Sequence, residues 1–352
     1  MLMSVGAGLL PAASPWPAES HTAACKLPML DRHFTKNMSG AYWNATTRTF
    51  WVCCNSPGLF WALVEDGSGG WKIATNANGT KARWKPGGDL EGICQPVDSQ
   101  PLIYLMDETG YVRQYDVSDF GVVKELRTWD IRANAGPNGN SGPEAITFVP
   151  DAWLRREGFR DASGTLRTSS NGMGGLMFVG HQTGGYVHVF DLNPNNNTFA
   201  YHGKIKTSQS ETADLAFDRN SGMLYLWHNL GPNYLEVAEL NSTPVGNERR
   251  FRTLIEYTGP RSGNLEGIAL AVNPTGDDWI LLADDDNDSG EALTLYKHFH
   301  PNKDTDNDGL PDAWELRHFG STTVTDGKPD SDGDGQSDLQ EFRAGTEPVK
   351  VP

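Results

Sequence analysis

The chain repeats itself about every 52 residues, and this period constrains its fold more than any other feature. The repeated segments are MSGAYWN (38–44), LEGICQP (90–96), PEAITFV (143–149), ADLAFDR (213–219) and LEGIALA (265–271). Aligned on Ser39, Glu91, Glu144, Ala213 and Glu266, they are separated by 52, 53, 69 and 53 residues. The long third step contains the polar stretch 153–172, which we interpret as a loop insertion. A nearly uniform period indicates one structural unit that is built several times.

Each segment is followed by further hydrophobic runs that alternate apolar and polar residues between turns rich in Gly, Asn, Asp or Thr. These runs lie at 49–55, 102–108, 176–182, 223–229 and 279–285, and then at 111–117, 186–192, 234–240 and 292–299. Alternation with β-branched and aromatic residues predicts antiparallel strands. About four strands per 50 residues is typical of a β-propeller blade.

We therefore predict an all-β fold, a β-propeller over residues 26–300 with a small C-terminal module at 301–352. Five blades fit the repeat, six are the alternative count, and a β-sandwich with coincidental spacing is the alternative fold. The 39 glycines and 11 tryptophans agree with many tight turns and pleated surfaces. The last blade has three clear strands, so we expect residues 26–35 to supply its outer strand.

The N-terminus and the cysteines give less specific signals. Residues 1–25 resemble a degraded signal peptide, with an apolar stretch that no Lys or Arg precedes. No run approaches the ~20 apolar residues of a membrane helix, so no membrane span is predicted. Cys25, Cys53, Cys54 and Cys94 show no CxxC spacing. Cys53 or Cys54 could pair with Cys94 in an oxidising compartment, and buried free thiols are the alternative.

Negative charge is concentrated at the C-terminus. The formal net charge is −16, and residues 301–352 contain twelve Asp and Glu against five Lys and Arg. No basic cluster is suited to a phosphate backbone, so nucleic acid is not an expected partner. The expected partners are cations.

Two segments of this tail, 304–315 and 330–341, match the calcium-loop pattern D-x-[DN]-x-[DN]-G-x5-E. Calcium takes six to eight oxygen ligands, and the glycine at position 6 permits the sharp turn between them. In the first loop the predicted ligands are Asp304, Asp306, Asp308, the carbonyl of Leu310, Asp312 (directly or through water) and Glu315. In the second loop they are Asp330, Asp332, Asp334, the carbonyl of Gln336, Asp338 and Glu341.

A short helix is expected after each loop, at 313–319 and 339–344, with Gly320 and Gly345 as stop signals. A disordered acidic tail is the alternative. Without a helix before either loop, the tail is similar to thrombospondin type 3 and dockerin-like repeats. The resemblance is carried by D-x-D-x-D-G-L-P-D-x-W-E, then F-G and A-G-T-E-P. It implies a structural or adhesive module that binds calcium and is not catalytic.

Three repeats carry glutamate at the same position: Glu91, Glu144 and Glu266. The first strand of a blade lines the central channel, so these side chains should converge near one channel end. Such carboxylates repel one another unless a cation or a proton lies between them. We regard them as candidate metal-binding or catalytic residues, with bonding to neighbouring backbone groups as the alternative.

Short motifs resemble two propeller families, the esterase-like phytases and the SdiA-regulated proteins. They are DLEGI (89–93), NLEGIA (264–269) and LLADDDN (281–287), together with MSG (38–40) and ADLAFD (213–218). The first family's name implies ester or phosphoester hydrolysis, but no agreed catalytic set maps onto this chain. No GxSxG motif is present. Structural or surface roles are expected for His181, His228, His298 and His300, and a solvated turn for the acidic run 284–288.

Two functions remain open from the sequence. One is a secreted propeller that binds an extracellular ligand or surface and carries a calcium-stabilised C-terminal module. The other is a metal-dependent phosphoester or ester hydrolase, with Glu91, Glu144, Glu266 and Asp284–Asp286 around calcium. Weak calcium loops fill only where calcium is abundant, which favours an extracellular, periplasmic or cell-surface location.

Overall fold

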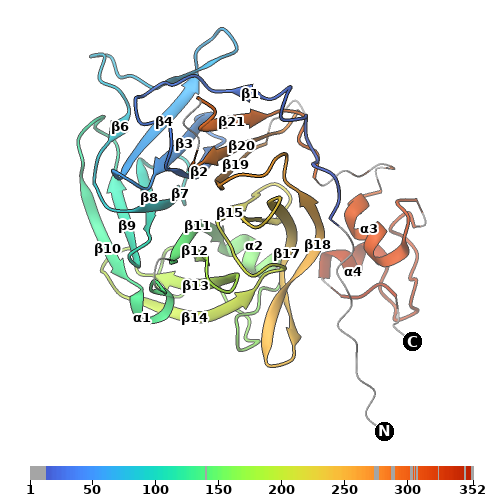
Figure 1. Cartoon of the computed structure of the whole chain (residues 1–352). Coiled ribbons are helices and arrows are strands. Elements are labelled where there is room, and N and C mark those ends of the chain that lie inside the picture. Colours follow the sequence, from blue (N-terminus) through green and yellow to red (C-terminus); the bar gives the residue numbers. More distant parts are fainter. Residues whose placement is uncertain are drawn as a thin grey trace.

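The computed structural model describes residues 13–138, 141–272, 277–286, 290–301, 304, 306, 308–323, 325–344 and 346–349. Nearly all of its regular structure is β-strand, and the strands are arranged as a ring (Figure 1). The all-β propeller prediction is confirmed. None of the described helices is long and apolar enough to cross a membrane.

The first two four-strand units are antiparallel meanders. The first consists of β2 (Met38–Asn44), β3 (Thr49–Cys54), β4 (Leu59–Glu65) and β5 (Trp71–Ile73), with β6 (Arg83–Trp84) pairing to β4. The second consists of β7 (Leu90–Cys94), β8 (Leu102–Asp107), β9 (Tyr111–Asp116) and β10 (Glu125–Asp130). The short helix α1 (Arg132–Ala135) follows β10.

The third and fourth units share one eight-stranded sheet. The third contains β11 (Pro143–Pro150), β12 (Gly175–His181), β13 (Tyr186–Leu192) and β14 (Phe199–Lys206). The fourth contains β15 (Asp214–Phe217), β16 (Leu224–His228), β17 (Tyr234–Val245) and β18 (Glu248–Thr258). The two join where β14 meets β18 in parallel at Lys206 and Arg250. The predicted insertion, 153–172, lies between β11 and β12 and begins within α2 (Asp151–Arg156).

The fifth unit is completed from the other end of the chain. It contains β19 (Leu265–Ala271), β20 (Trp279–Asp284), β21 (Leu293–Tyr296) and the N-terminal β1 (Cys25–Lys26). The prediction that an N-terminal segment supplies this outer strand is confirmed, although pairing begins at Cys25, which lies opposite Leu295. Of the predicted segment 26–35, only Lys26 is part of the strand.

The five units close into a ring because their innermost strands adjoin one another in order. β2 lies beside β7 and β19, while β15 adjoins β11 and β19, and β7 adjoins β11. Some of these strands approach so closely that a side chain would not fit between them. A Cβ at Gly92 would lie 2.8 Å from the Glu144 carbonyl oxygen. Apolar clusters fill the space between neighbouring units.

Residues before β1 belong to the folded propeller as well. Ser14 exchanges backbone hydrogen bonds with β18, donating to Glu256 at 2.7 Å and accepting from Thr258 at 2.8 Å. Trp16 packs edge-on against Trp227 and Tyr296, at 6.2 and 5.5 Å between ring centroids. The part of the expected leader at 1–12 lies outside the described residues, whereas residues 14–24, here called the N-terminal strap, connect units four and five.

Two helices form the C-terminal module beside β18, α3 (Asp312–Phe319) and α4 (Asp338–Ala344) (Figure 1). They begin one residue before the helices expected from the sequence. Gly320 has the left-handed φ of +72° that suits a helix stop, and Gly345 lies outside the described residues. All four cysteines are free thiols, and Cys53, Cys54 and Cys94 are buried. The disulfide alternative is therefore not realised.

Candidate metal centres

The first acidic loop folds around its own carboxylates. Asp304 accepts hydrogen bonds from the backbone amides of Asp308 and Gly309, at 3.3 and 3.0 Å. Gly309 has a φ of +93°, which lets the chain bend at the position the sequence predicts. One carboxylate oxygen from each of Asp304, Asp306 and Asp308 lies within 4.8 Å of the others. Thr305 and Asn307 of this loop lie outside the described residues.

Glu315 closes this loop from the first turn of α3, and its side chain is fully buried at 0% exposure. Neither of its carboxylate oxygens has a hydrogen-bond partner, and Oδ2 of Asp308 also has none. Burial, followed by the charges of Asp306 and Asp308, raises the pKa of Glu315 to about 7. A buried carboxylate without donors is costly unless a cation or proton neutralises it.

The second loop repeats this arrangement. Asp330 accepts hydrogen bonds from the amides of Gly333, Asp334 and Gly335, at 2.7, 3.1 and 2.8 Å. Gly335 has a φ of +98°. One carboxylate oxygen from each of Asp330, Asp332 and Asp334 lies within 4.8 Å of the others. The amide of Gln336 donates to Asp334 at 2.9 Å, so the chain turns at the expected position.

Glu341 of α4 corresponds to Glu315. It is fully buried, its Oε2 lacks a partner, and burial with the charge of Asp332 raises its pKa to about 7. Asp338 differs from Glu341 in having hydroxyl donors. It accepts hydrogen bonds from Thr325 and Ser331, at 2.6 and 2.8 Å. Asp312 begins α3 as Asp338 begins α4. Both loops thus gather oxygen donors of the kind that calcium prefers.

A third acidic cluster lies where the inner strands begin, and we call it the channel mouth. Glu91, Glu144 and Glu266 each lie at a β-bulge, where the register shifts between the residues on either side of the glutamate. A bulge re-aims a side chain out of the regular alternation. Glu91 and Glu144 are 4% and 7% exposed, and Glu266 is half-buried. The predicted convergence is found for Glu91 and Glu266, through a shared serine.

The shared group is the hydroxyl of Ser39, which hydrogen-bonds Glu91 and lies 3.0 Å from Glu266 Oε2. One hydroxyl carries one proton, so it cannot donate to two ionised carboxylates at once. Burial, and then the charge of Glu266, raises the pKa of Glu91 well above its usual range. Burial, and then the charge of Glu91, does the same for Glu144.

Asp89 and Glu108 also belong to the channel mouth, and the sequence analysis did not select them. With Glu91 they place three carboxylate oxygens within 4.8 Å of one another, and Glu144 is not part of this group. Burial and the charge of Asp89 raise the pKa of Glu108 to about 7. Asp89 stands in the quoted motif DLEGI, but Glu108 joins it only because the β8–β9 turn folds back.

The acidic run that begins at the end of β20 approaches this cluster at one point, since burial, and then the charge of Asp285, raises the pKa of Glu266 to about 8. Asp284 forms an ion pair with Arg261, and Asp285 accepts hydrogen bonds from the Asn55 and Asn264 side chains, at 3.2 and 2.9 Å. Asp288 lies outside the described residues. The expected solvated turn is therefore wrong for Asp284, which is 3% exposed at the end of β20, and Asp285 is half-buried.

Three of the four histidines considered in the sequence have side-chain partners within the protein, and the fourth, His300, lines a pocket. His228 and Glu236, both 0% exposed, lie 3.0 Å apart inside unit four. The two ring nitrogens of His181 contact the Gly136 carbonyl at 3.1 Å and the Thr183 amide at 3.0 Å. His298 pairs with Asp277 at 2.8 Å on the surface.

Asp214, 1% exposed, is a buried carboxylate at the inner strands that sequence reasoning missed. It lies opposite the penultimate residue of its neighbouring strand, the place that Gly92, Ala145 and Gly267 occupy in other units. Its oxygens accept from the amides of Leu215 at 2.8 Å and Ile268 at 2.7 Å. A third bond comes from the amide of Ala41, and burial raises the pKa of Asp214. Asp214 therefore ties β15 to β19 and β2.

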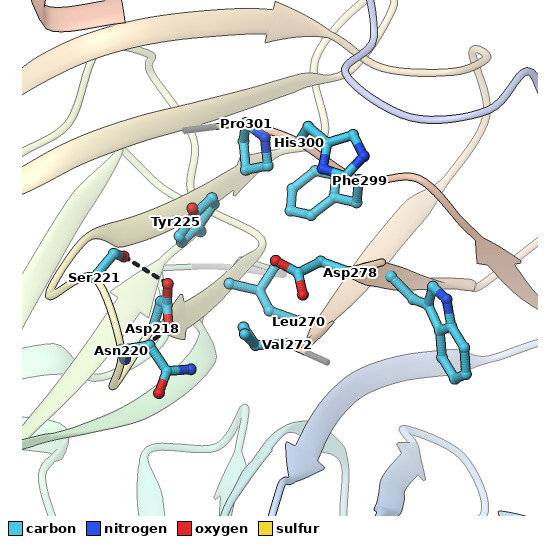
Figure 2. A pocket seen from close by; sticks show the side chains of 11 residues that line it. Asp218, Asn220, Ser221, Tyr225, Leu270, Val272, Asp278, Phe299, His300 and Pro301 are labelled. Atoms are coloured by element: carbon cyan, nitrogen blue, oxygen red, sulfur yellow. Dashed lines mark hydrogen bonds between the residues drawn. The ribbon is translucent and has the colours of Figure 1, made fainter. Parts of the chain in front are cut away.

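A pocket of about 380 Å³ opens between units four and five (Figure 2). Asp218, Ser221 and Tyr225 line it from unit four, and Leu270 and Asp278 from unit five, beside Phe299 and His300. A second pocket of about 250 Å³ extends toward the far ends of β2, β15 and β19. Both pockets lie away from the glutamates, which stand at the starts of the inner strands.

Comparison with known proteins gives one family match, at the C-terminus. A family model described as bacterial TSP3 repeat matches residues 304–321 and 330–351. The match covers the two acidic loops and confirms the thrombospondin type 3 resemblance there. No curated protein matches the chain.

Solved structures resemble the propeller only distantly. A glutaminyl cyclase from Myxococcus xanthus is 11% identical, over 77% of this chain and 92% of that chain, with a TM-score of 0.44. A nidogen/laminin complex is 11% identical over 71% and 77%, with a TM-score of 0.38. A periplasmic gluconolactonase from Pseudomonas aeruginosa is 14% identical over 69% and 60%, with a TM-score of 0.37. At these values no activity carries over, and the propeller assignment stands on the strand order.

Proposed function

We propose that this chain is a calcium-binding propeller protein that works outside the cytosol, with two calcium ions in its C-terminal module. The single observation that carries the proposal is Glu315, whose buried oxygens have no hydrogen-bond partner beside three clustered aspartates. A proton would neutralise only one charge, whereas a dication satisfies several carboxylates together. The bacterial TSP3 match over the same residues supports it.

The proposed ligands are those expected from the sequence. Asp304, Asp306, Asp308, the Leu310 carbonyl, Asp312 and Glu315 hold the first ion. Asp330, Asp332, Asp334, the Gln336 carbonyl, Asp338 and Glu341 hold the second. Asp338 already bonds two hydroxyl groups, so it contributes through a bound water or orients the loop.

Calorimetric titration of the full chain with calcium tests the proposal. We expect two ions to bind, and Glu315→Gln and Glu341→Gln to remove one each. Asp326→Asn is the matched control, because Asp326 is an exposed carboxylate of the same module that pairs with Lys328 at 2.8 Å. No calcium binding by the wild-type protein, or full binding by both glutamine variants, would contradict the assignment.

The propeller then serves as a binding module for an extracellular ligand or surface. Location outside the cytosol follows from the loops, because weak sites of this type require roughly 10⁻⁴–10⁻³ M calcium. The pocket between units four and five, which Tyr225, Trp279 and Phe299 line, is a candidate ligand site. Fractionation of the native host cells, with the protein detected by antibody, tests the location.

A second candidate function is metal-dependent hydrolysis at the channel mouth. It is favoured by Ser39 between Glu91 and Glu266, and by the approach of Asp89 and Glu108 to Glu91. A bound cation would supply Lewis-acid activation of water and neutralise a phosphate ester. The carboxylates of Asp89, Glu91 and Glu108 would hold it. The esterase-like-phytase resemblance adds only short motifs to this case.

A panel of phosphoesters and carboxylic esters with added calcium tests the second candidate. The double variant Glu91→Gln/Glu266→Gln should abolish any activity found, while Glu341→Gln serves as a control outside the propeller. Full activity in the double variant would refute a reaction at the channel mouth.

A further inference from the structure

The calcium module contacts the outer strand of the fourth unit through apolar side chains. Leu310 and Trp314 are both 0% exposed and share one packed cluster with Leu254 and Tyr257 of β18. The Tyr257 hydroxyl also donates to the Pro301 carbonyl at 3.1 Å, just before the first loop. Burying Trp314 removes a large apolar area from water and stabilises the contact.

A buried arginine adds polar contacts at the same place. Arg252 of β18 is 3% exposed and donates to His318 Nε2 of α3 at 2.7 Å. It also contacts the Thr346 carbonyl at 3.3 Å and the Glu347 carboxylate at 3.5 Å, both beyond α4. Its remaining acidic neighbour is Glu239 of β17, at 3.5 Å. Arg252 thus joins α3 and the segment that follows α4 to unit four.

The docking residues are the calcium-loop residues or their direct neighbours. Leu310, whose carbonyl is a proposed ligand, points its side chain into the interface, and Trp314 precedes the ligand Glu315. In the second loop, Phe342 follows Glu341 and packs on Trp314 with 5.4 Å between ring centroids. The same backbone turns therefore position both the ion ligands and the docking side chains.

We propose that calcium binding and docking of the module on β18 are thermodynamically coupled, so that the module is a calcium-dependent latch on unit four. The inference rests on the proposed calcium function and adds a regulation to it. Without the ion, the clustered carboxylates repel one another and favour an open loop. Opening the loop displaces Leu310 and Trp314 from the interface, because they lie on the same turns.

The latch also bears on ring closure. The apolar cluster that receives Trp314 includes Ala24 and, at its edge, Trp16 of the N-terminal strap. This strap pairs with β18 and leads into β1, which completes the fifth unit. Release of the module on calcium removal therefore loosens the strap as well as the module.

Coupling is reciprocal, and this provides the test. If calcium binding favours docking of the module, then docking must favour calcium binding by the same factor. A substitution in the propeller that weakens docking should therefore lower the affinity for calcium. The variant Arg252→Met/Glu239→Gln removes the arginine without leaving a buried carboxylate unpaired, and it alters no ion ligand. Arg250→Met is the matched control, because Arg250 lies on the same strand but pairs with Lys206 of β14.

Calorimetric titration of the full-length variants should show two ions in each protein, with affinity at least about fivefold lower in the double variant. Unchanged affinity in the double variant would overturn the latch. Absence of calcium binding in the wild-type protein would instead overturn the proposed function beneath it.

Hydrogen exchange on the wild-type protein tests the latch without any variant. Chelation should raise exchange in the loops and also in residues 14–24 and β18. Increased exchange confined to the loops would show that the module binds calcium without latching, and would overturn the inference.

Discussion

The acidic loops and the channel mouth both concentrate carboxylates, but they satisfy them differently. In the loops, Asp304 and Asp330 accept hydrogen bonds from backbone amides of their own turns, and Glu315 has both oxygens buried without a partner. At the mouth, Glu91 and Glu266 share the hydroxyl of Ser39. The loops therefore leave oxygen atoms available for an ion, whereas the mouth carboxylates already have a proton donor.

This difference separates a site for a cation from a site that protons can neutralise. A raised pKa at the mouth means that some carboxyl groups keep their protons near neutral pH. The pKa values of Glu315 and Glu341 in the loops are raised as well. Both carboxylate oxygens of Glu315, and Oε2 of Glu341, lack a hydrogen-bond donor. Each region can be perturbed independently, because the acidic loops are local in sequence, whereas the glutamates of the channel mouth come from three units.

The largest effect is expected from removing a closing carboxylate. Glu315→Gln should weaken calcium binding at the first loop roughly 1,000-fold, about 4 kcal/mol, because glutamine cannot supply a bidentate negative ligand. The second loop should keep most of its affinity. Calorimetry of the single variant measures the calcium affinity of both loops. Unchanged affinity at the first loop would show that Glu315 is not a calcium ligand.

Asp214→Ala tests a buried carboxylate that backbone amides satisfy. The substitution leaves the amides of Leu215 and Ile268 without acceptors, at about 1–3 kcal/mol each, so we expect roughly 3 kcal/mol lower stability. Asp66→Ala is the control, because Asp66 accepts amide bonds in an exposed turn. Urea unfolding measures both variants, and equal small losses would show that Asp214 does not tie the inner strands together.

Glu91→Gln should stabilise the propeller at pH 8 in chelator. Folding raises the pKa of Glu91, so the unfolded chain loses this proton at lower pH than the folded one does, and stability falls as pH rises above about 4.5. Glutamine keeps the hydrogen bond to Ser39 without the charge, which we expect to add about 2 kcal/mol. The gain should disappear at pH 4.5. A loss of stability at pH 8 would favour a structural role for the ionised glutamate.

The smallest effect concerns pH and the loops. Protons compete with calcium for Glu315, whose pKa is raised to about 7. Its ionised fraction falls about tenfold between pH 8 and pH 6, so affinity at the first loop should fall about tenfold. Glu315→Gln should flatten this dependence. Titrations at the two pH values provide the test, and an equal slope in the variant would assign the competing proton to another group.

Sequence reasoning reached the parts of this protein whose determinants are local. The loops and their glycines follow from spacing, and the strands follow from alternation. Glu108 was missed because only the β8–β9 turn brings it to Asp89 and Glu91, and no local pattern encodes that contact. Asp89 was missed although it lies two residues before Glu91 in the motif DLEGI. Asp214 was missed because the repeat was aligned on Ala213. That the Asp214 side chain reaches β19 depends on how the inner strands adjoin one another, which local spacing does not reveal. Docking through Arg252 likewise depends on long-range contacts.

The most direct test of the central claim is a count of bound calcium ions by native mass spectrometry, at millimolar calcium and pH 8. The double variant Glu315→Gln/Glu341→Gln should carry two fewer ions than the wild-type chain, and any ion at the channel mouth would remain in both. An equal count in the two proteins would contradict the assignment of calcium to the C-terminal loops.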